Sequence, residues 1–262
     1  MMRWMMRFFI MLVLLLPAFA YAAEDTVPEE IIADLSQNKV SINTNFDGSN
    51  ILVFGAIKRE TPVPSDAPLG LIITISGPSE KIVVRRKSRV AGIWVNTDAV
   101  RLDKAPSFYA VSTNAPVKDV LTSDEDHRFR VTIRQAIRSV WTTQLAPDAP
   151  QFTEALIRQR EDQNLYQLNE GGVKLAEDTL FRSTVALPSN LVEGNYSTRI
   201  FLTRNGRVVS AYSTNLDVRK VGMERWIFNL AHQKPLYYGL LSILIAVAAG
   251  WGASTVFRYI RS

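Results

Sequence analysis

The class of fold is decided by residues 195–220, NYSTRIFLTRNGRVVSAYSTNLDVRK. Within this segment two runs rich in β-branched and aromatic residues flank Asn205-Gly206. The dipeptide favours the left-handed backbone that a two-residue β-hairpin turn requires. The segment therefore predicts two antiparallel strands that are joined by a tight turn at Asn205-Gly206.

Six more runs with strand character precede this hairpin, and turn signals separate them. The runs are KVSINTNF (39–46), ILVFGAI (51–57), LGLIITISG (69–77), KIVVRRK (81–87), GIWVN (92–96) and SFYAVSTN (107–114). The turn signals include DGSN (47–50), TPVPSDAP (61–68) and GPS (77–79). Many short strands at this spacing are typical of an antiparallel sandwich, and we expect an immunoglobulin-like one.

The middle of the chain changes to helical spacing. Apolar side chains recur between residues 124 and 141, at Phe129, Ile133, Ile137 and Val140. Basic side chains form an adjacent stripe, at Arg130, Arg134 and Arg138. The pattern predicts a helix whose basic face is either solvated or a docking surface. A second helix is expected over 149–169, before Gly171-Gly172.

Strands return after these helices, in GVKLAED (172–178) and TLFRSTVALP (179–188). The fold class is therefore mainly β with a helical insert. Two arrangements are consistent with this order of elements. The chain forms either two sandwich modules separated by helices, or one sandwich that the late strands complete.

The N-terminus has the three parts of a secretory signal peptide. Arg3 and Arg7 precede the apolar run 8–16, and Ala20-Tyr21-Ala22 supplies the small residues of a cleavage site. We expect cleavage after Ala22, because the apolar run is short for a membrane span. The alternative is an uncleaved anchor.

The C-terminal region contains 22 residues without a charge, 236–257. At about 1.5 Å per residue this helix spans roughly 33 Å, which matches a hydrocarbon core of about 30 Å. Small side chains recur every four residues along it, at Ser242, Ala246, Gly250 and Ser254. Such a face allows another helix to pack closely, although small residues are also common in spans that meet only lipid.

The segment before this span, MERWIFNLAHQKP (223–235), has an amphipathic pattern. Its apolar face either lies on the membrane surface or packs on the β-rich domain. The sequence thus predicts seven parts. They are a signal peptide (1–22), a β-sandwich module (23–115), a helical segment (116–171), a second β module (172–221), a juxtamembrane segment (222–235), a transmembrane helix (236–257) and a cytoplasmic tail (258–262).

Charge and cysteine content exclude several classes of function. Four of the 30 basic residues, Arg3, Arg7, Arg258 and Arg261, lie at the ends of the chain, which leaves 26 basic against 25 acidic residues. The excess positive charge therefore lies at the ends of the chain, where basic residues orient membrane segments. Nucleic-acid binding is not expected. The absence of cysteine excludes disulfides, thiolate metal sites and a cysteine nucleophile.

No motif for catalysis, a cofactor or a metal ion stands out. His127 lies near Asp124 and Asp126 in DEDHRFR (124–130), but acidic residues at a helix start are explained by the helix dipole. The densest basic cluster comprises Arg85, Arg86, Lys87 and Arg89, and it lies near Trp94. It is either an anion- or lipid-binding patch or the charged protection of an edge strand.

Several stretches together resemble a known family. They are NFDGSNILVFGAI (45–57), GPSEKIVVRRKSRVAGIWVN (77–96), LFRSTVALPSNLVEGNYSTRIFLTRNGRVV (180–209) and PLYYGLLSILIAVAAGW (235–251). In this order they resemble the putative transmembrane protein family of alphaproteobacteria. The resemblance implies association with a permease of the sulfite/organosulfonate-exporter type, and it supplies no catalytic residues.

Two functions are consistent with these observations. The first is a non-catalytic, membrane-anchored accessory protein of the bacterial inner membrane, with its main domain in the periplasm and a membrane protein as partner. The second is a periplasmic module that binds anions or lipid headgroups through the basic cluster. An envelope enzyme would instead require a serine–lysine pair or a carboxylate pair gathered in one pocket.

Overall fold

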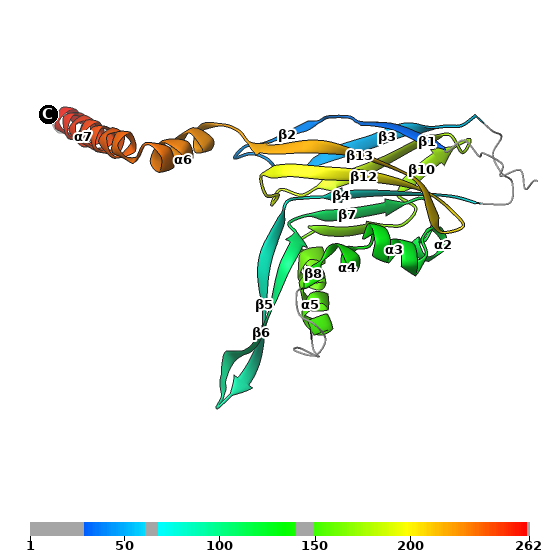
Figure 1. Ribbon diagram of the computed structural model, residues 1–262. Helices are drawn as coiled ribbons and strands as arrows, with labels where there is room; N and C mark the ends of the chain where they lie inside the picture. Colours follow the sequence, from blue (N-terminus) through cyan, green and yellow to red (C-terminus); the bar gives the residue numbers. More distant parts are fainter. Residues whose placement is uncertain (1–28, 61–67, 140–148, 261–262) are drawn as a thin grey trace, which may run out of the picture.

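The computed structural model describes residues 29–60, 68–139 and 149–260. Two sheets pack face to face in it and form one sandwich (Figure 1). The four-stranded sheet has the order β1 (Glu30–Leu35), β3 (Ser49–Lys58), β11 (Leu180–Leu187), β10 (Val173–Ala176). The six-stranded sheet has the order β2 (Lys39–Ile42), β13 (Arg207–Lys220), β12 (Gly194–Arg204), β4 (Leu69–Ser76), β7 (Tyr109–Thr113), β9 (Tyr166–Asn169).

Each sheet contains strands from both the N-terminal and the C-terminal part of the β-rich region. β11 pairs with β3, where Val185 faces Ile51, and β12 pairs with β4, where Ile200 faces Ile73. All four of these side chains are buried in one hydrophobic core. Of the two arrangements that the sequence left open, the structure therefore has the single sandwich.

The predicted hairpin and its turn are confirmed. β12 and β13 pair from Gly194 to Arg204, and Arg204 lies opposite Arg207 across the turn. Asn205 and Gly206 both have positive φ, 49° and 74°. These values are those that a tight hairpin turn needs, which explains why this dipeptide joins the strands.

The strand order is similar to that of immunoglobulin-type sandwiches, where strands A, B, E and D form one sheet and G, F and C the other. Tyr196 near the start of β12 donates a hydrogen bond to the Val192 carbonyl (2.8 Å), as the tyrosine of such domains does. However, β9 pairs with β7 in parallel, and the chain has no disulfide. The mainly β fold is confirmed, and its immunoglobulin-like character stays a prediction.

The helical segment is more broken than its spacing predicts. In place of one helix over 124–141 the structure has α3 (Ser123–Phe129), α4 (Ile133–Ala136) and the short strand β8 (Arg138–Ser139). α3 ends because Arg130 adopts a left-handed conformation, with φ of 53°. The Asp126 carboxylate then accepts hydrogen bonds from the backbone N–H groups of Val131 and Thr132. The prediction of one continuous helix is wrong, and its basic stripe is divided, with Arg130 after α3, Arg134 in α4 and Arg138 in β8.

The second predicted helix is shorter than expected. α5 covers Ala149–Asp162, and the strand β9 takes up the residues before Gly171-Gly172. The chain leaves the helix at Asn164, which has a φ of 57° and whose N–H bonds the Glu161 carbonyl. The six-stranded sheet is flanked by four helices, namely α2 (Val117–Val120), α3, α4 and α5 (Figure 1).

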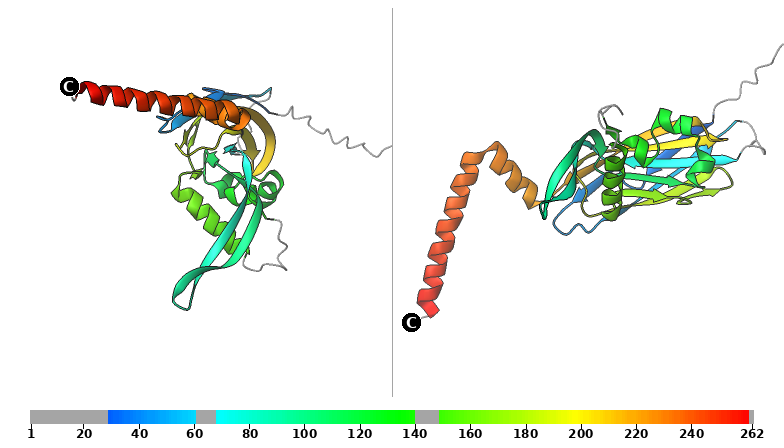
Figure 2. Two further views of the ribbon diagram at one scale, coloured as in Figure 1. Left: turned by 90° about the vertical axis from the view of Figure 1, so that its left-hand side faces the viewer. Right: turned by 90° about the horizontal axis from the view of Figure 1, so that it is seen from below.

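A long hairpin extends from the sandwich and is called the arm here. It consists of β5 (Ser79–Val90) and β6 (Ile93–Pro106), and β8 pairs with β6 near its base. Figure 2 shows the arm projecting beyond both sheets. The sequence predicts both strands, but it places them inside an ordinary sandwich module.

Two helices follow β13. α6 (Met223–Gln233) and α7 (Pro235–Ile260) extend away from the sandwich (Figure 1). α7 contains the candidate membrane span Pro235–Ser254, no residue of which is buried. The predicted C-terminal membrane helix is confirmed as an element. The signal peptide lies outside the described residues.

An ionic cluster joins the two sheets at the start of β1. Glu29 accepts bonds from Arg59 Nε (2.6 Å) and from Arg204 Nε and Nη2 (3.0 and 2.7 Å). Arg59 follows β3 of the four-stranded sheet, and Arg204 ends β12 of the six-stranded sheet. The three side chains are only 9–14% exposed. The carboxylate therefore ties one sheet to the other in a chain without disulfides.

We expect Glu29→Gln to lower the free energy of unfolding at neutral pH by about 2–4 kcal/mol, because two shielded guanidinium groups lose their counter-charge. Burial raises the pKa of Glu29, but its bonds to Arg204 and Arg59 outweigh burial and hold the pKa below its ordinary value of 4.5. The stabilisation is therefore present above about pH 4.5 and is lost as the pH falls through the lowered pKa. The variant should lack this acid-dependent loss.

Urea unfolding of the full chain in mild detergent, followed by near-ultraviolet circular dichroism of the buried tyrosines at several pH values, measures both effects. Glu30→Gln is the matched control, because its pair with Lys58 is exposed and 3.5 Å long. The control should change the free energy by less than about 0.5 kcal/mol. Equal effects of the two substitutions would contradict the assigned role of Glu29.

Candidate functional site

The arm separates the predicted basic cluster into two faces. Successive side chains of a strand point to opposite sides, so Arg85, Lys87 and Arg89 share one face of β5 while Arg86 lies on the other. Trp94 of β6 lies directly opposite Arg89, and Arg101 lies opposite Val83, so both belong to the first face. This basic face thus comprises Arg85, Lys87, Arg89 and Arg101 with Trp94 beside them.

Arg86 has a structural role on the opposite face. It donates to Asp98 Oδ2 from Nε (3.1 Å) and Nη2 (3.0 Å), and these bonds hold the pKa of Asp98 below its usual value. Its guanidinium also lies over the ring of buried Phe152 in α5, 5.4 Å from the ring centre. The structure therefore brings three of the four predicted residues together and excludes Arg86.

β5 lies at the edge of its three-stranded sheet, so one of the two predicted explanations for the basic cluster, protection of an edge strand, fits its position. The sequence places Trp94 near this cluster, but it does not identify the apolar end of the arm as a whole. There Val90, Ile93 and Trp94 are 50%, 64% and 68% exposed. Arg101 was missed as well, because it joins the basic face only through cross-strand pairing.

The candidate packing face of α7 is exposed along its length. Ser242, Ala246, Gly250 and Ser254 all lie in the described part of the helix and are open to their surroundings. The Ser242 hydroxyl donates to the Tyr238 carbonyl (2.8 Å), which satisfies it within the helix. A Cβ atom at Gly250 would meet no atom within 4 Å beyond the adjoining residues and backbone of its own helix. The face is therefore free of contacts that would hinder a neighbouring helix.

α6 presents apolar side chains to its surroundings and not to the sandwich. Trp226, Ile227 and Phe228 are 43–59% exposed, and Phe228 stacks on His232 at 4.0 Å between ring centres. Of the two predicted positions for this helix, the exposure of these side chains favours the membrane surface.

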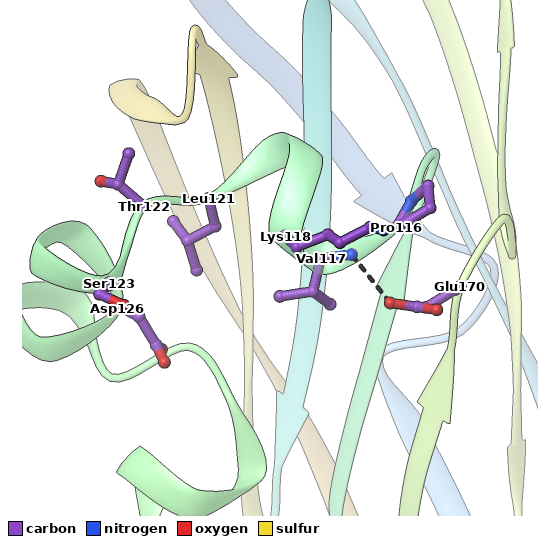
Figure 3. Close-up of a pocket in the computed structure, with 8 residues that line it drawn as sticks. All are labelled: Pro116, Val117, Lys118, Leu121, Thr122, Ser123, Asp126 and Glu170. Carbon is purple, nitrogen blue, oxygen red and sulfur yellow. Dashed lines mark hydrogen bonds between the residues drawn. The ribbon is translucent and has the colours of Figure 1, made fainter.

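A cavity of about 430 Å³ lies between α2, α3 and the end of β9 (Figure 3). It contains Lys118 and Ser123, the residue types of a serine–lysine pair, but no hydrogen bond joins them in the structure. Its carboxylates hold the backbone. Glu170 accepts a hydrogen bond from the Val117 N–H (2.8 Å), and Asp126 Oδ2 accepts one from the Thr132 hydroxyl (2.7 Å). Both carboxylates therefore serve local folding.

His127 does not gather metal ligands around it. Within residues 29–60, 68–139 and 149–260 no group of three histidine or acidic side chains could hold a metal ion. Asp126, its neighbour, instead stabilises the turn after α3.

A buried polar network anchors α3 to the six-stranded sheet. Arg199 of β12 donates to the Phe129 and Arg130 carbonyls at the end of α3 (2.8 and 3.0 Å) and to the Tyr109 hydroxyl (3.0 Å). Tyr109 donates in turn to the Val131 carbonyl (2.9 Å). Burial raises the pKa of Tyr109, so it remains a neutral donor. The network is structural, since its members bond to one another and to the backbone.

An apolar groove lies on the outer face of the four-stranded sheet. Ile32, Phe54 and Leu180 are 43–59% exposed there, and the groove has a volume of about 1010 Å³. Ala56 lies between Ile32 and Leu180 in the strand register, so the apolar row is continuous across three strands. Contiguous apolar surface of this kind is typical of a contact surface.

The comparisons with known proteins agree with this picture of a membrane-attached β domain. No curated protein matches the chain. A family model described as "Putative transmembrane protein (Alph_Pro_TM)" matches residues 30–259, which include the whole sandwich, the arm, α6 and nearly all of α7. The chain therefore belongs to this transmembrane protein family, as the resemblance in its sequence predicts.

Proposed function

We propose that the protein is a non-catalytic accessory protein of the bacterial inner membrane, with its sandwich in the periplasm and residues 258–262 in the cytoplasm. The observation that carries this proposal is the detached span: no residue of Pro235–Ser254 is buried against the sandwich. A helix that serves only as an anchor is surrounded by lipid. A helix with a face of small residues can in addition pack against a neighbouring helix.

The proposed partner is a membrane protein with several spans. The face Ser242, Ala246, Gly250 and Ser254 would pack against one of its helices, and the apolar groove at Ile32, Phe54 and Leu180 offers the sandwich a second contact. The family resemblance supports a permease of the sulfite/organosulfonate-exporter type as this partner. The cavity carboxylates support a non-catalytic role, since both bond to the fold itself.

A second candidate function is binding of anions or lipid headgroups. The specific observation in its favour is the basic face, where Arg85, Lys87 and Arg89 point to one side of the arm.

We expect Gly250→Leu to reduce recovery of the membrane partner about three- to tenfold, because the larger side chain separates helices that pack through small residues. The measurement is affinity purification of the tagged full chain from native membranes in mild detergent, with quantitative mass spectrometry of the captured proteins. The substitution does not disturb the chain itself, since Gly250 has open space around it.

Ala248→Leu is the matched control. It adds the same side chain on the opposite side of the helix, because residues 248 and 250 are about 200° apart at about 100° per residue. Partner recovery should remain at the level of the unmodified chain. Equal recovery with Gly250→Leu would remove the small-residue face from the proposal.

We also expect the mature chain to begin at Ala23 and the sandwich to face the periplasm. Intact-mass measurement of the purified protein determines the first residue. Protease added to spheroplasts should digest the sandwich, whereas inside-out vesicles should protect it. A retained N-terminus would support the uncleaved anchor, and the reverse protection pattern would contradict the proposed orientation.

A further inference from the structure

The arm and the membrane tether leave the same end of the sandwich (Figures 1 and 2). The strand registers show this directly. Ser76, at the end of β4, lies opposite Ser197 of β12, which lies opposite Asn215 of β13. β5 begins three residues after Ser76, and β13 runs on five residues from Asn215 to Lys220 before α6. The base of the arm is therefore beside the exit toward the membrane.

The outer half of the arm extends away from the packed domain. Near the base Val100 and Leu102 are buried, and α5 is linked to β5 by the Arg160–Glu80 ion pair (3.2 Å). Beyond Arg86, whose guanidinium lies over Phe152 of α5, the four residues of β5 from Lys87 to Val90 reach about 13 Å at about 3.3 Å per residue. The arm therefore projects from the end of the sandwich at which the chain continues into α6 and α7.

The turn at the end of the arm is apolar, in contrast to the same kind of turn inside the sandwich. Ala91 and Gly92 have φ of 48° and 86°, and Asn205 and Gly206 have φ of 49° and 74°. Asparagine is favoured in this conformation, whereas alanine is not. The arm therefore accepts a less favourable turn residue and carries five consecutive apolar residues, VAGIW (90–94), at its exposed end.

Positive charge is concentrated behind this apolar end. Residues 79–106 contain seven basic and three acidic side chains, a net charge of +4, while the chain between its two ends is nearly neutral. In the described structure Arg85, Lys87 and Arg89 form no ion pair, and Asp98 is bound to Arg86 on the opposite face. The charges on the basic face are thus not neutralised within the fold.

We propose that the arm docks on the anionic leaflet of the membrane that anchors α7, with Val90, Ile93 and Trp94 in the interface and Arg85, Lys87 and Arg89 on lipid phosphates. This inference rests on the second candidate function and specifies its ligand as anionic lipid. An apolar tip with a tryptophan and a basic flank matches the chemistry of an anionic bilayer surface. Edge protection explains the charges of β5, but it does not explain the exposed apolar turn.

The absence of cysteine allows a single spin label to report the position of the tip. The full chain with Ile93→Cys, labelled with a nitroxide, is placed in nanodiscs of phosphatidylcholine alone or of phosphatidylcholine with phosphatidylglycerol. Collision of the label with a water-soluble nickel chelate should fall strongly in the anionic discs only. The same label at Arg207→Cys, at the opposite end of the sandwich, should remain accessible in both.

Two sets of variants test the chemistry. Arg85→Ser/Lys87→Ser/Arg89→Ser should lower the docking equilibrium about fivefold for each charge removed, and high salt should weaken docking in the unmodified chain. Lys118→Ser/Lys174→Ser/Arg182→Ser removes three exposed charges elsewhere and should have no effect. Ala91→Asn favours the turn but adds a polar group at the tip, so it should weaken docking without unfolding the arm.

Equal accessibility of the Ile93 label in both kinds of disc would overturn the proposal. So would protection that occurs only in native membranes, because the arm would then contact a protein. The discs contain no partner protein, so either failure leaves the proposed packing of α7 untouched.

Discussion

The pairing of β12 with β4 is the constraint on which the rest of the molecule depends. It joins strands that are more than 120 residues apart in the sequence, and Ile200 and Ile73 are buried at its centre. Because β12 also pairs with β13, the direction of β4 fixes where the arm begins relative to the final strand. One antiparallel register therefore brings the tether and the arm to the same end of the sandwich.

Close contacts around β4 and β12 hold α2 and the end of α3 against the six-stranded sheet. A Cβ atom at Gly70 would lie 2.9 Å from the Val120 Cβ of α2, so only glycine allows this approach. Arg199 then holds the end of α3 on the same face of the sheet through carbonyl groups. These contacts involve backbone atoms and a long side chain, and they do not require a regular helical repeat.

The sequence predicts best where local chemistry alone determines structure. Asn205-Gly206 needs no tertiary contact to favour its turn, and the uncharged run 236–257 is explained by the membrane. The helix predicted over 124–141 failed because its periodicity is shared by three short elements. After α3 the Asp126 carboxylate accepts a hydrogen bond from the backbone, and Arg130 adopts a left-handed conformation. Neither feature alters the spacing of the apolar residues in the sequence.

The same reasoning explains which part of the candidate site was predictable. Four basic residues in five positions identify a charged strand, but only a defined strand separates Arg86 from Arg85, Lys87 and Arg89. Trp94 pairs with Arg89, Asp98 pairs with Arg86, and the strand register shifts between these two pairs. Because of this shift, Trp94 and Asp98 face opposite sides of the arm although they are four residues apart in β6. The spacing of residues in the sequence describes one strand, whereas the surface of the arm is formed by side chains from two paired strands. The chemistry of the arm is therefore a property of the hairpin as a whole.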